Sequence, residues 1–159
     1  MGKDFMRKVI VSGGNGFIGS SLILCLLAKG IEVHAIVNEN HQRLDTILPE
    51  ECIHILRGGA ELAVEIVTRV EPDTIFHIAA VYAEPVSARD VLSMIDGNLT
   101  LGACLLFAST QCSQRPVFVN TGTYWQFDSN SAYSPNTLYA ATKHAFQDIL
   151  HSGVAALVQ

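Results

Sequence analysis

Tyr139 and Lys143 stand four residues apart in the segment Tyr-Ala-Ala-Thr-Lys. On a helix, this spacing places the phenol and the ammonium on one face, within reach of a common ligand. Tyrosine has an ordinary pKa of about 10 and is a poor base at neutral pH, but a nearby cation favours the phenolate. The pair can therefore exchange a proton with a substrate hydroxyl while a hydride moves the other way. The same spacing also occurs by chance on exposed helices, so its weight depends on the surrounding fold.

A glycine-rich segment near the N-terminus predicts a dinucleotide-binding turn. Glycines stand at positions 13, 16 and 19 in Ser-Gly-Gly-Asn-Gly-Phe-Ile-Gly, directly after a short apolar run. Glycine permits a tight turn and a close approach of the backbone to a pyrophosphate, and a helix N-terminus offers N–H groups and partial positive charge. A tight turn without a ligand is the alternative, and the lysine of a mononucleotide P-loop is missing. The expected cofactor contacts are Gly13, Asn15, Gly16, Phe17, Ile18 and Gly19.

The elements that must position these residues follow from the alternation of short β-branched runs with longer segments of helical apolar spacing. This alternation predicts consecutive βαβ units and a parallel sheet. Strands are expected over residues 8–12, 32–37, 52–56, 74–78 and 116–120, with a possible sixth at 154–158. Helices are expected over residues 18–29, 60–70, 90–110 and 137–150, and a polar, aromatic loop of the kind that shapes a ligand site over 122–136.

Composition bounds the class of protein. The chain has 159 residues, of which 49% are hydrophobic and 16% charged, which predicts one folded domain and excludes intrinsic disorder. The net charge of −5 without a basic cluster argues against nucleic acid as a partner. The apolar stretch 17–28 is shorter than the roughly 20 residues of a membrane span, so no membrane is expected. We also expect no secretion signal and a cytoplasmic location.

The four cysteines carry no metal-site signature. Cys25, Cys52, Cys104 and Cys112 form no Cys-x-x-Cys pair and have no histidine at ligand spacing. Each lies in an apolar context, so we expect buried free thiols and no metal.

The Gly-x-x-Gly-x-x-Gly spacing followed by Phe-Ile-Gly resembles the extended branch of the short-chain dehydrogenase/reductase superfamily, the NAD-dependent epimerase/dehydratase family. This resemblance implies a Rossmann-type, doubly wound parallel sheet in a three-layer α/β/α arrangement, with NAD(P) as cofactor. It places Tyr139 and Lys143 in the catalytic motif, with Lys143 also holding the nicotinamide ribose. Thr121, just past the fifth predicted strand, would orient the reacting hydroxyl, and Thr123 is the alternative.

Other segments support the same branch. His77-Ile78-Ala79-Ala80 resembles the family's small-residue turn at the cofactor, so Ala79 and Ala80 are expected contacts, and Asn98 lies where the family keeps a structural asparagine. Gly122-Thr123 replaces the Asp-Glu pair of the dehydratases, which argues against 4,6-dehydration. The loop over 120–126 is similar to that of deoxysugar 4-ketoreductases of the CDP-abequose synthase type.

The end of the second predicted strand governs the choice of cofactor. An acidic residue there would bind both ribose hydroxyls and repel a 2′-phosphate, but this chain has the neutral Asn38. Glu39 is an alternative acid, and Arg43 follows within reach of a phosphate. We therefore lean weakly to NADP, with a solvated loop as the other interpretation. Arg57-Gly58-Gly59-Ala60 lacks the aspartate that the family usually places near the adenine.

The resemblance covers nearly all of this chain but only about the N-terminal half of a typical family member. Residues 1–159 are thus expected to form the NAD(P)-binding domain without the C-terminal substrate domain. Two functions stay open: an NAD(P)-dependent nucleotide-sugar epimerase or ketoreductase, and a catalytically incomplete dinucleotide-binding module such as a redox sensor or assembly subunit. By the resemblance, the helices over 90–110 and 137–150 would form a homodimer interface.

Overall fold

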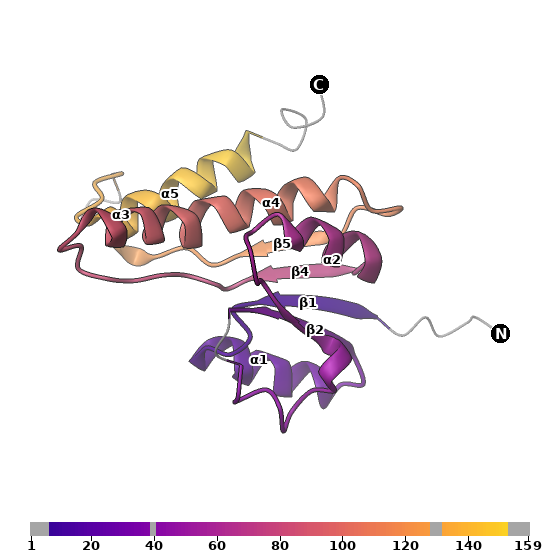
Figure 1. The fold of residues 1–159 in the computed structure, drawn as a ribbon. Coiled ribbons are helices and arrows are strands. Elements are labelled where there is room, and N and C mark those ends of the chain that lie inside the picture. The colour runs from indigo at the N-terminus through magenta and orange to yellow at the C-terminus, as the bar shows by residue number, and fades with distance from the viewer. Residues whose placement is uncertain (1–6, 39–40, 128–131, 153–159) are drawn as a thin grey trace.

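Five parallel strands form one sheet in the order β3-β2-β1-β4-β5 in the computed structural model, which describes residues 7–38, 41–127 and 132–152 (Figure 1). The strands are β1 (Lys8–Ser12), β2 (Glu32–Val37), β3 (Ile53–Ile55), β4 (Thr74–His77) and β5 (Val117–Asn120). Because β1 pairs with β2 on one side and β4 on the other, the crossovers leave in opposite directions at β1. The carboxyl ends of β1 and β4 therefore flank the point where such sheets bind ligands.

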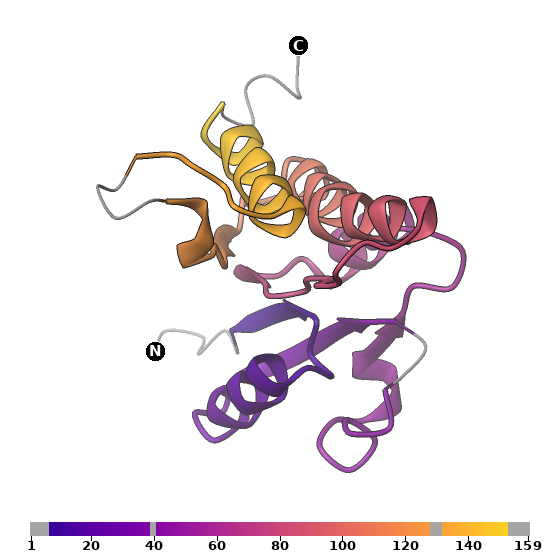
Figure 2. The same cartoon turned by 90° about the vertical axis from the view of Figure 1, so that its left-hand side faces the viewer.

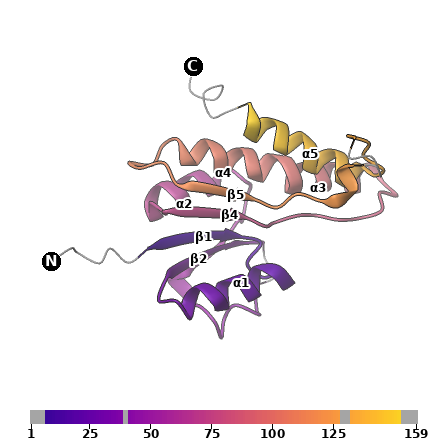
Figure 3. The same cartoon turned by 180° about the vertical axis from the view of Figure 1, so that it is seen from behind.

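Helices cover both faces of the sheet and complete the predicted three layers. Helix α1 (Phe17–Leu27) lies on one face, and Figure 2 shows the remaining helices on the other. These are α2 (Leu62–Val70), α3 (Ala88–Ile95), α4 (Leu101–Ser109) and α5 (Leu138–His151). The view from behind in Figure 3 shows α4 and α5 stacked above β4 and β5. The Rossmann-type α/β prediction is confirmed.

The core has one apolar cluster on each face, because successive residues of a strand point to opposite sides. The cluster under α1 contains Val9, Val11, Val33, Ala35, Val37, Ile23, Leu26, Leu44 and Leu48. The cluster under α2 and α4 contains Ile10, Ile36, Ile75, Ala63, Ile66, Val67, Val70, Leu105 and Ala108. Strands that are buried on both faces read as continuous β-branched runs, which explains the strong sequence signal.

The predicted helix over 90–110 is interrupted in the structure. A capping box of Ser87 and Asp90 begins α3, and a π-helical segment, Asp96–Thr100, joins α3 to α4. Together they form a helical stretch, Ala88–Ser109, which is long and apolar enough to cross a membrane by length and composition. In the fold this stretch packs against α2 and α5, and 39% of its apolar part is buried.

Several local expectations are corrected. The third strand is shorter than predicted because Cys52 belongs to a 3-10 turn, Glu50–Cys52, and the loop after β5 holds a second 3-10 turn, Tyr124–Gln126. The possible strand at 154–158 lies outside the described residues.

The prediction of four buried cysteines is wrong. Cys25 is exposed and the other three thiols are half-buried, although all four are free. Helix α1 buries only Gly19, Ser20, Ile23 and Leu26, and Cys25 lies off that face.

Candidate functional site

The glycine turn is forced by close backbone packing. Gly13 has a φ of +75°, and its amide donates to the carbonyl of Ile36 at 2.9 Å. A Cβ at Gly13 would lie 2.7 Å from the backbone of Ala79, and one at Gly19 would overlap the carbonyl of Gly13. Gly16 is the N-cap of α1 and provides no side-chain capping bond. A helix N-terminus without a side-chain cap leaves N–H groups that can bind an anion.

A cleft of about 590 Å³ opens between this turn and the carboxyl ends of β2 and β4. Nine of the predicted cofactor contacts line it: Gly13, Asn15, Gly16, Phe17, Ile18, Gly19, Asn38, Ala79 and Ala80. Arg43, Thr121, Tyr139 and Lys143 do not line this cleft. The structure therefore brings the glycine turn and the small-residue turn together, whereas the predicted catalytic residues Thr121, Tyr139 and Lys143 lie outside the wall of this cleft.

The rest of the lining was missed from the sequence. It consists of Ile36, Val37, Leu56, Ile78, Val81, Gly97 and Leu101. Val37, Leu56 and Ile78 end a strand or follow one directly, so the rule that ligands bind at the carboxyl edge of a parallel sheet would have found these three.

The end of the cleft at Asn38 carries neutral polar side chains among the described residues. The Asn15 side-chain amide donates to Oδ1 of Asn38 at 3.1 Å. Arg43 instead donates to Oγ of Ser20 on α1 at 3.4 Å. Glu39, the alternative acid, lies outside the described residues.

Asn98 ties three segments together beside the cleft. It is fully buried in the π-helical segment, accepts a bond from the Val81 amide at 2.7 Å and donates to the Val81 carbonyl at 2.9 Å. It also donates to Oγ1 of Thr142 at 3.1 Å. A Cβ at Gly97 would overlap the Val81 side chain, so the helix passes close to this chain segment. The structural role expected of Asn98 is confirmed, and Thr142 lies on α5 between Tyr139 and Lys143.

Helix α5 carries Tyr139, which is half-buried, and Lys143, which is buried. Thr137 caps α5 by accepting a bond from the Ala140 amide at 3.1 Å. The Lys143 side chain is only 1% exposed, and burial lowers the pKa of its ammonium. Burial raises the pKa of the Tyr139 phenol. Both shifts favour the neutral side chain in the protein alone.

Thr121 follows β5 and is held against β4. Its hydroxyl donates to the carbonyl of His77 at 3.3 Å, and its amide donates to the same oxygen at 3.2 Å. The alternative, Thr123, caps the 3-10 turn by accepting a bond from the Trp125 amide at 3.4 Å. Of the two hydroxyls, that of Thr123 thus has a local capping role.

Three buried side-chain atoms in the described part of the chain have no hydrogen-bond partner: Nε2 of His77, Oδ1 of Asn120 and Nζ of Lys143. His77 and Asn120 are paired residues at the ends of β4 and β5. Nδ1 of His77 is 2.8 Å from Oγ of Ser12, and burial, with a smaller effect of Lys143, lowers the pKa of His77 to about 3. Unpaired buried polar groups are costly, and they gather at functional sites.

A model of the NAD dependent epimerase/dehydratase family matches residues 9–156. The chain belongs to this family. It is 29% identical over 120 residues to CDP-abequose synthase of Yersinia pseudotuberculosis, covering 76% of this chain and 41% of that protein. It is 32% identical over 115 residues to UDP-glucose 4-epimerase of Mycoplasma pneumoniae, covering 69% of this chain and 33% of that protein. The family resemblance drawn from the glycine and tyrosine motifs is thereby confirmed.

Solved structures of family proteins share the fold. UDP-glucose 4-epimerase of Thermus thermophilus, in complex with NAD, superposes with a TM-score of 0.76 at 26% identity, covering 94% of this chain and 51% of that one. WbmH of Bordetella bronchiseptica, in complex with NAD+, gives a TM-score of 0.77 at 24% identity, covering 92% and 53%. The chain thus spans about half the length of these structures and less than half of the two curated relatives.

Proposed function

We propose that the chain binds a nicotinamide dinucleotide in the cleft and acts as an NAD(P)-dependent nucleotide-sugar epimerase or ketoreductase. The observation that carries this proposal is the buried amine of Lys143, which has no hydrogen-bond partner among the described residues and lies on the same helix as Tyr139. Such a group is costly for the fold unless a ligand bonds it. Ribose hydroxyls would bond it, and the glycine turn fits a pyrophosphate at the same edge of the sheet.

The chain's own residues then have distinct tasks. The dinucleotide supplies or accepts the hydride. Lys143 holds the ribose and, when charged, lowers the pKa of Tyr139, whose phenol oxygen gives or takes the proton of the sugar hydroxyl. The proton of the sugar hydroxyl goes to or comes from Tyr139, so Thr121 would orient the sugar oxygen by turning its own hydroxyl from the His77 carbonyl and donating to that oxygen.

The choice between NADP and NAD is a finer part of the proposal. The neutral Asn38 at the end of β2 supports NADP, because no carboxylate at this position repels a 2′-phosphate. Against this, Arg43 bonds Ser20 instead of lining the cleft, and the solved relatives named above are complexes with NAD. Parallel titrations with both cofactors measure the preference directly.

A homodimer through α3, α4 and α5 is also part of the proposal. Leu92 on α3 and Phe107 on α4 are exposed, which supports an apolar interface, whereas Leu105, Leu106 and Phe146 are buried in the core. Sedimentation at micromolar concentration should show a dimer, and a monomer would contradict it.

The second candidate is a dinucleotide-binding module without turnover. It is favoured by the position of Thr121, Tyr139 and Lys143 outside the wall of the cleft. Such a module would bind the cofactor, but addition of a nucleotide sugar would leave the nicotinamide absorbance unchanged.

Tyr139→Phe tests the proposed function. Calorimetric titration should give micromolar affinity for NADH or NADPH in both the wild type and the variant, because the phenol hydroxyl is not required to hold the dinucleotide. Sugar-dependent change in nicotinamide absorbance should fall by about 10²–10⁴-fold in the variant.

Tyr124→Phe is the matched control, since Tyr124 is an exposed tyrosine on the neighbouring turn. It should leave turnover unchanged. Retained turnover in Tyr139→Phe would remove Tyr139 from its role, and a folded wild-type chain that binds neither cofactor would overturn the proposal.

A further inference from the structure

Aromatic side chains from separate segments converge on the Tyr139 ring. Tyr82 follows β4, Trp125 lies in the 3-10 turn after β5, and both contact Tyr139 edge-on, with centroids 5.4 Å and 6.3 Å away and interplanar angles of 88° and 83°. Tyr82 and Trp125 also contact each other at 5.7 Å. Perpendicular contacts of this kind suit the charge distribution of aromatic rings. We call Tyr82 and Trp125 the aromatic platform.

The platform is fixed in place although it faces solvent. Tyr82 is 56% exposed and Trp125 is 43% exposed. Gln126, next to Trp125, is buried, and its side-chain Oε1 accepts a bond from the Thr123 amide at 2.8 Å. The side-chain Nε2 of Gln126 lies 2.9 Å from Oε1 of Gln147 and 3.0 Å from Nδ1 of His144. The turn that presents Trp125 is therefore anchored to α5. Large apolar rings that are held rigidly in water indicate a binding surface.

The contact with Tyr139 identifies the occupant. A hydroxyl that exchanges a proton with the Tyr139 phenol must lie within hydrogen-bond distance of that oxygen. The ring that carries such a hydroxyl then lies beside the platform, since both platform rings touch Tyr139. One face of a pyranose ring is formed by C–H groups and packs on an aromatic face, whereas a carboxylate is repelled by the negative face of the aromatic ring.

We propose that Tyr82 and Trp125 form the sugar subsite, where they stack against the C–H face of the hexose and select a neutral hexose over a uronic acid. This proposal rests on the proposed function, because it takes Tyr139 as the group that reaches the sugar hydroxyl. It adds two specificity-determining residues that the glycine and tyrosine motifs do not include.

The chain offers a direct probe, because Trp125 is its single tryptophan. With the protein saturated by oxidised cofactor, UDP-glucose and CDP-glucose are titrated while the tryptophan emission is recorded. At least one of them should give a saturable change, and the matching nucleoside diphosphate alone should give a much smaller one. UDP-glucuronate should bind at least about tenfold more weakly than UDP-glucose.

Substitution of the platform sharpens the test. Calorimetry on Trp125→Ala should show at least a tenfold loss of affinity for the nucleotide sugar, with affinities for the cofactor and for the nucleoside diphosphate unchanged. Trp125→Phe, which keeps a ring, should restore most of the loss. Tyr124→Ala is the matched control: Tyr124 is 81% exposed on the same turn, and its loss should change the affinity less than twofold.

The outcomes separate this inference from the proposed function. Failure of the wild type to bind the cofactor would count against the proposed function. Cofactor binding with no tryptophan response to either nucleotide sugar, or equal sugar affinity in Trp125→Ala and wild type, would overturn the platform alone. Circular dichroism of each variant shows that any lost affinity does not come from unfolding.

Discussion

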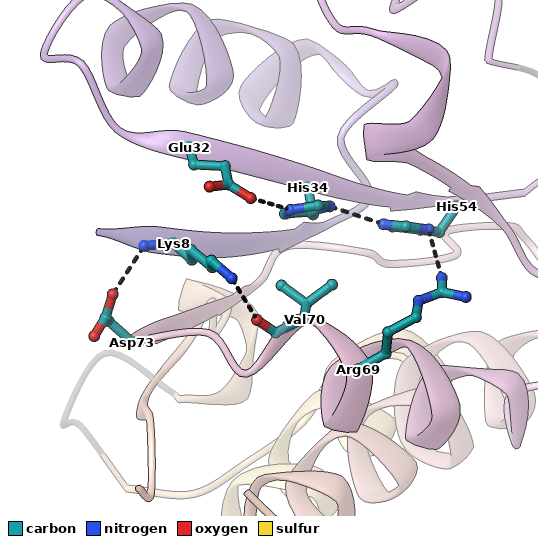
Figure 4. A network of polar contacts seen from close by, with 7 residues as sticks. All are labelled: Lys8, Glu32, His34, His54, Arg69, Val70 and Asp73. Atoms are coloured by element: carbon teal, nitrogen blue, oxygen red, sulfur yellow. Dashed lines mark hydrogen bonds and ion pairs between the residues drawn. The ribbon is translucent and has the colours of Figure 1, made fainter. Parts of the chain in front are cut away.

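The two ends of the sheet differ in how their polar side chains are hydrogen-bonded. At the carboxyl end, Lys143, Asn120 and His77 each leave a buried polar atom without a partner in the described structure. At the amino end, Figure 4 shows a chain of contacts between neighbouring side chains. His34 lies 2.9 Å from Glu32 and 3.0 Å from His54.

The hydrogen bonds in this chain of contacts at the amino end, which we call the amino-end chain, all run in one direction. Arg69 donates to Nδ1 of His54 at 3.5 Å, which leaves the His54 Nε2–H to donate to His34 Nδ1 and the His34 Nε2–H to donate to Glu32. Each histidine is satisfied in its neutral form. Lys8, nearby, donates its amide to Asp73 at 2.8 Å and its ammonium to the Val70 carbonyl at 3.5 Å.

A cavity therefore does not by itself mark the functional end. A pocket of about 510 Å³ also opens at the amino end, and Lys8, Glu32, His34, His54 and Arg69 belong to its lining. Those groups bond each other or, for Lys8, the neighbouring Asp73 and Val70, and so stabilise the fold, whereas the unpaired groups at the carboxyl end remain available to a ligand. Three substitutions test this difference.

Gly13→Ala should have the largest effect. Gly13 and Gly30 have similar positive φ values, +75° and +70°, so alanine costs about 1–2 kcal/mol of backbone strain at either position. At Gly13 the added Cβ also meets the Ala79 backbone, and at Gly30 it meets nothing within 4 Å. Urea denaturation should therefore show a loss of about 3 kcal/mol or more for Gly13→Ala, together with loss of cofactor binding.

Gly30→Ala is the control, because it lies away from the cleft at the end of α1. It should lower the free energy of unfolding by the strain alone, about 1–2 kcal/mol, and keep the cofactor affinity of the wild type. Equal losses in the two variants would mean that the approach of Ala79 does not constrain the turn.

Lys143→Met should have an intermediate effect of opposite sign. Removing a buried amine that lacks a partner should raise the free energy of unfolding of the cofactor-free protein by about 1–2 kcal/mol. The same variant should bind the dinucleotide more weakly in calorimetry, because the ribose loses its donor. Function and stability thus compete at this residue.

Lys29→Met provides the comparison at an exposed lysine, where the stability should stay within about 0.5 kcal/mol of wild type. A Lys143→Met protein that is less stable than wild type would show that the amine already has a stabilising partner.

Sequence patterns predicted those parts of the molecule that depend on local chain geometry. The glycine spacing predicted the turn because positive φ at Gly13 and close packing at Gly19 are decided within a few residues. Strands β1 and β2 were found because burial on both faces leaves continuous β-branched runs. Helix α1 is apolar on every side, so its sequence does not show which face is buried, and the prediction for Cys25 was wrong.

The features that escaped prediction depend on contacts between distant segments. The π-helical segment forms where Gly97 and Asn98 meet Val81, and no helical periodicity encodes that meeting. The aromatic platform is likewise invisible until the fold brings Tyr82 and Trp125 to Tyr139. Helix register and ring geometry follow from tertiary packing, which is why the motifs predicted nine residues of the cleft lining but neither the other seven nor the aromatic platform.

His54→Gln should have the smallest effect, confined to acid pH. Burial, then His34 and Arg69, lower the pKa of His54 to about 4, from about 6.5 in an unfolded chain. Between about pH 6.5 and pH 4, His54 is therefore protonated in the unfolded chain but neutral in the folded one. The free energy of unfolding falls as the pH is lowered through this window. His77 at the carboxyl end, with its pKa of about 3, contributes a loss of the same sign. Glutamine keeps a donor for His34 and an acceptor for Arg69, so urea denaturation should show little change at pH 7.5 and a shallower decline towards pH 5.

The remaining slope belongs in part to His77, and the exposed His151→Gln should leave the wild-type slope intact. A His54→Gln protein with the wild-type slope would show that the amino-end chain does not depend on a neutral His54.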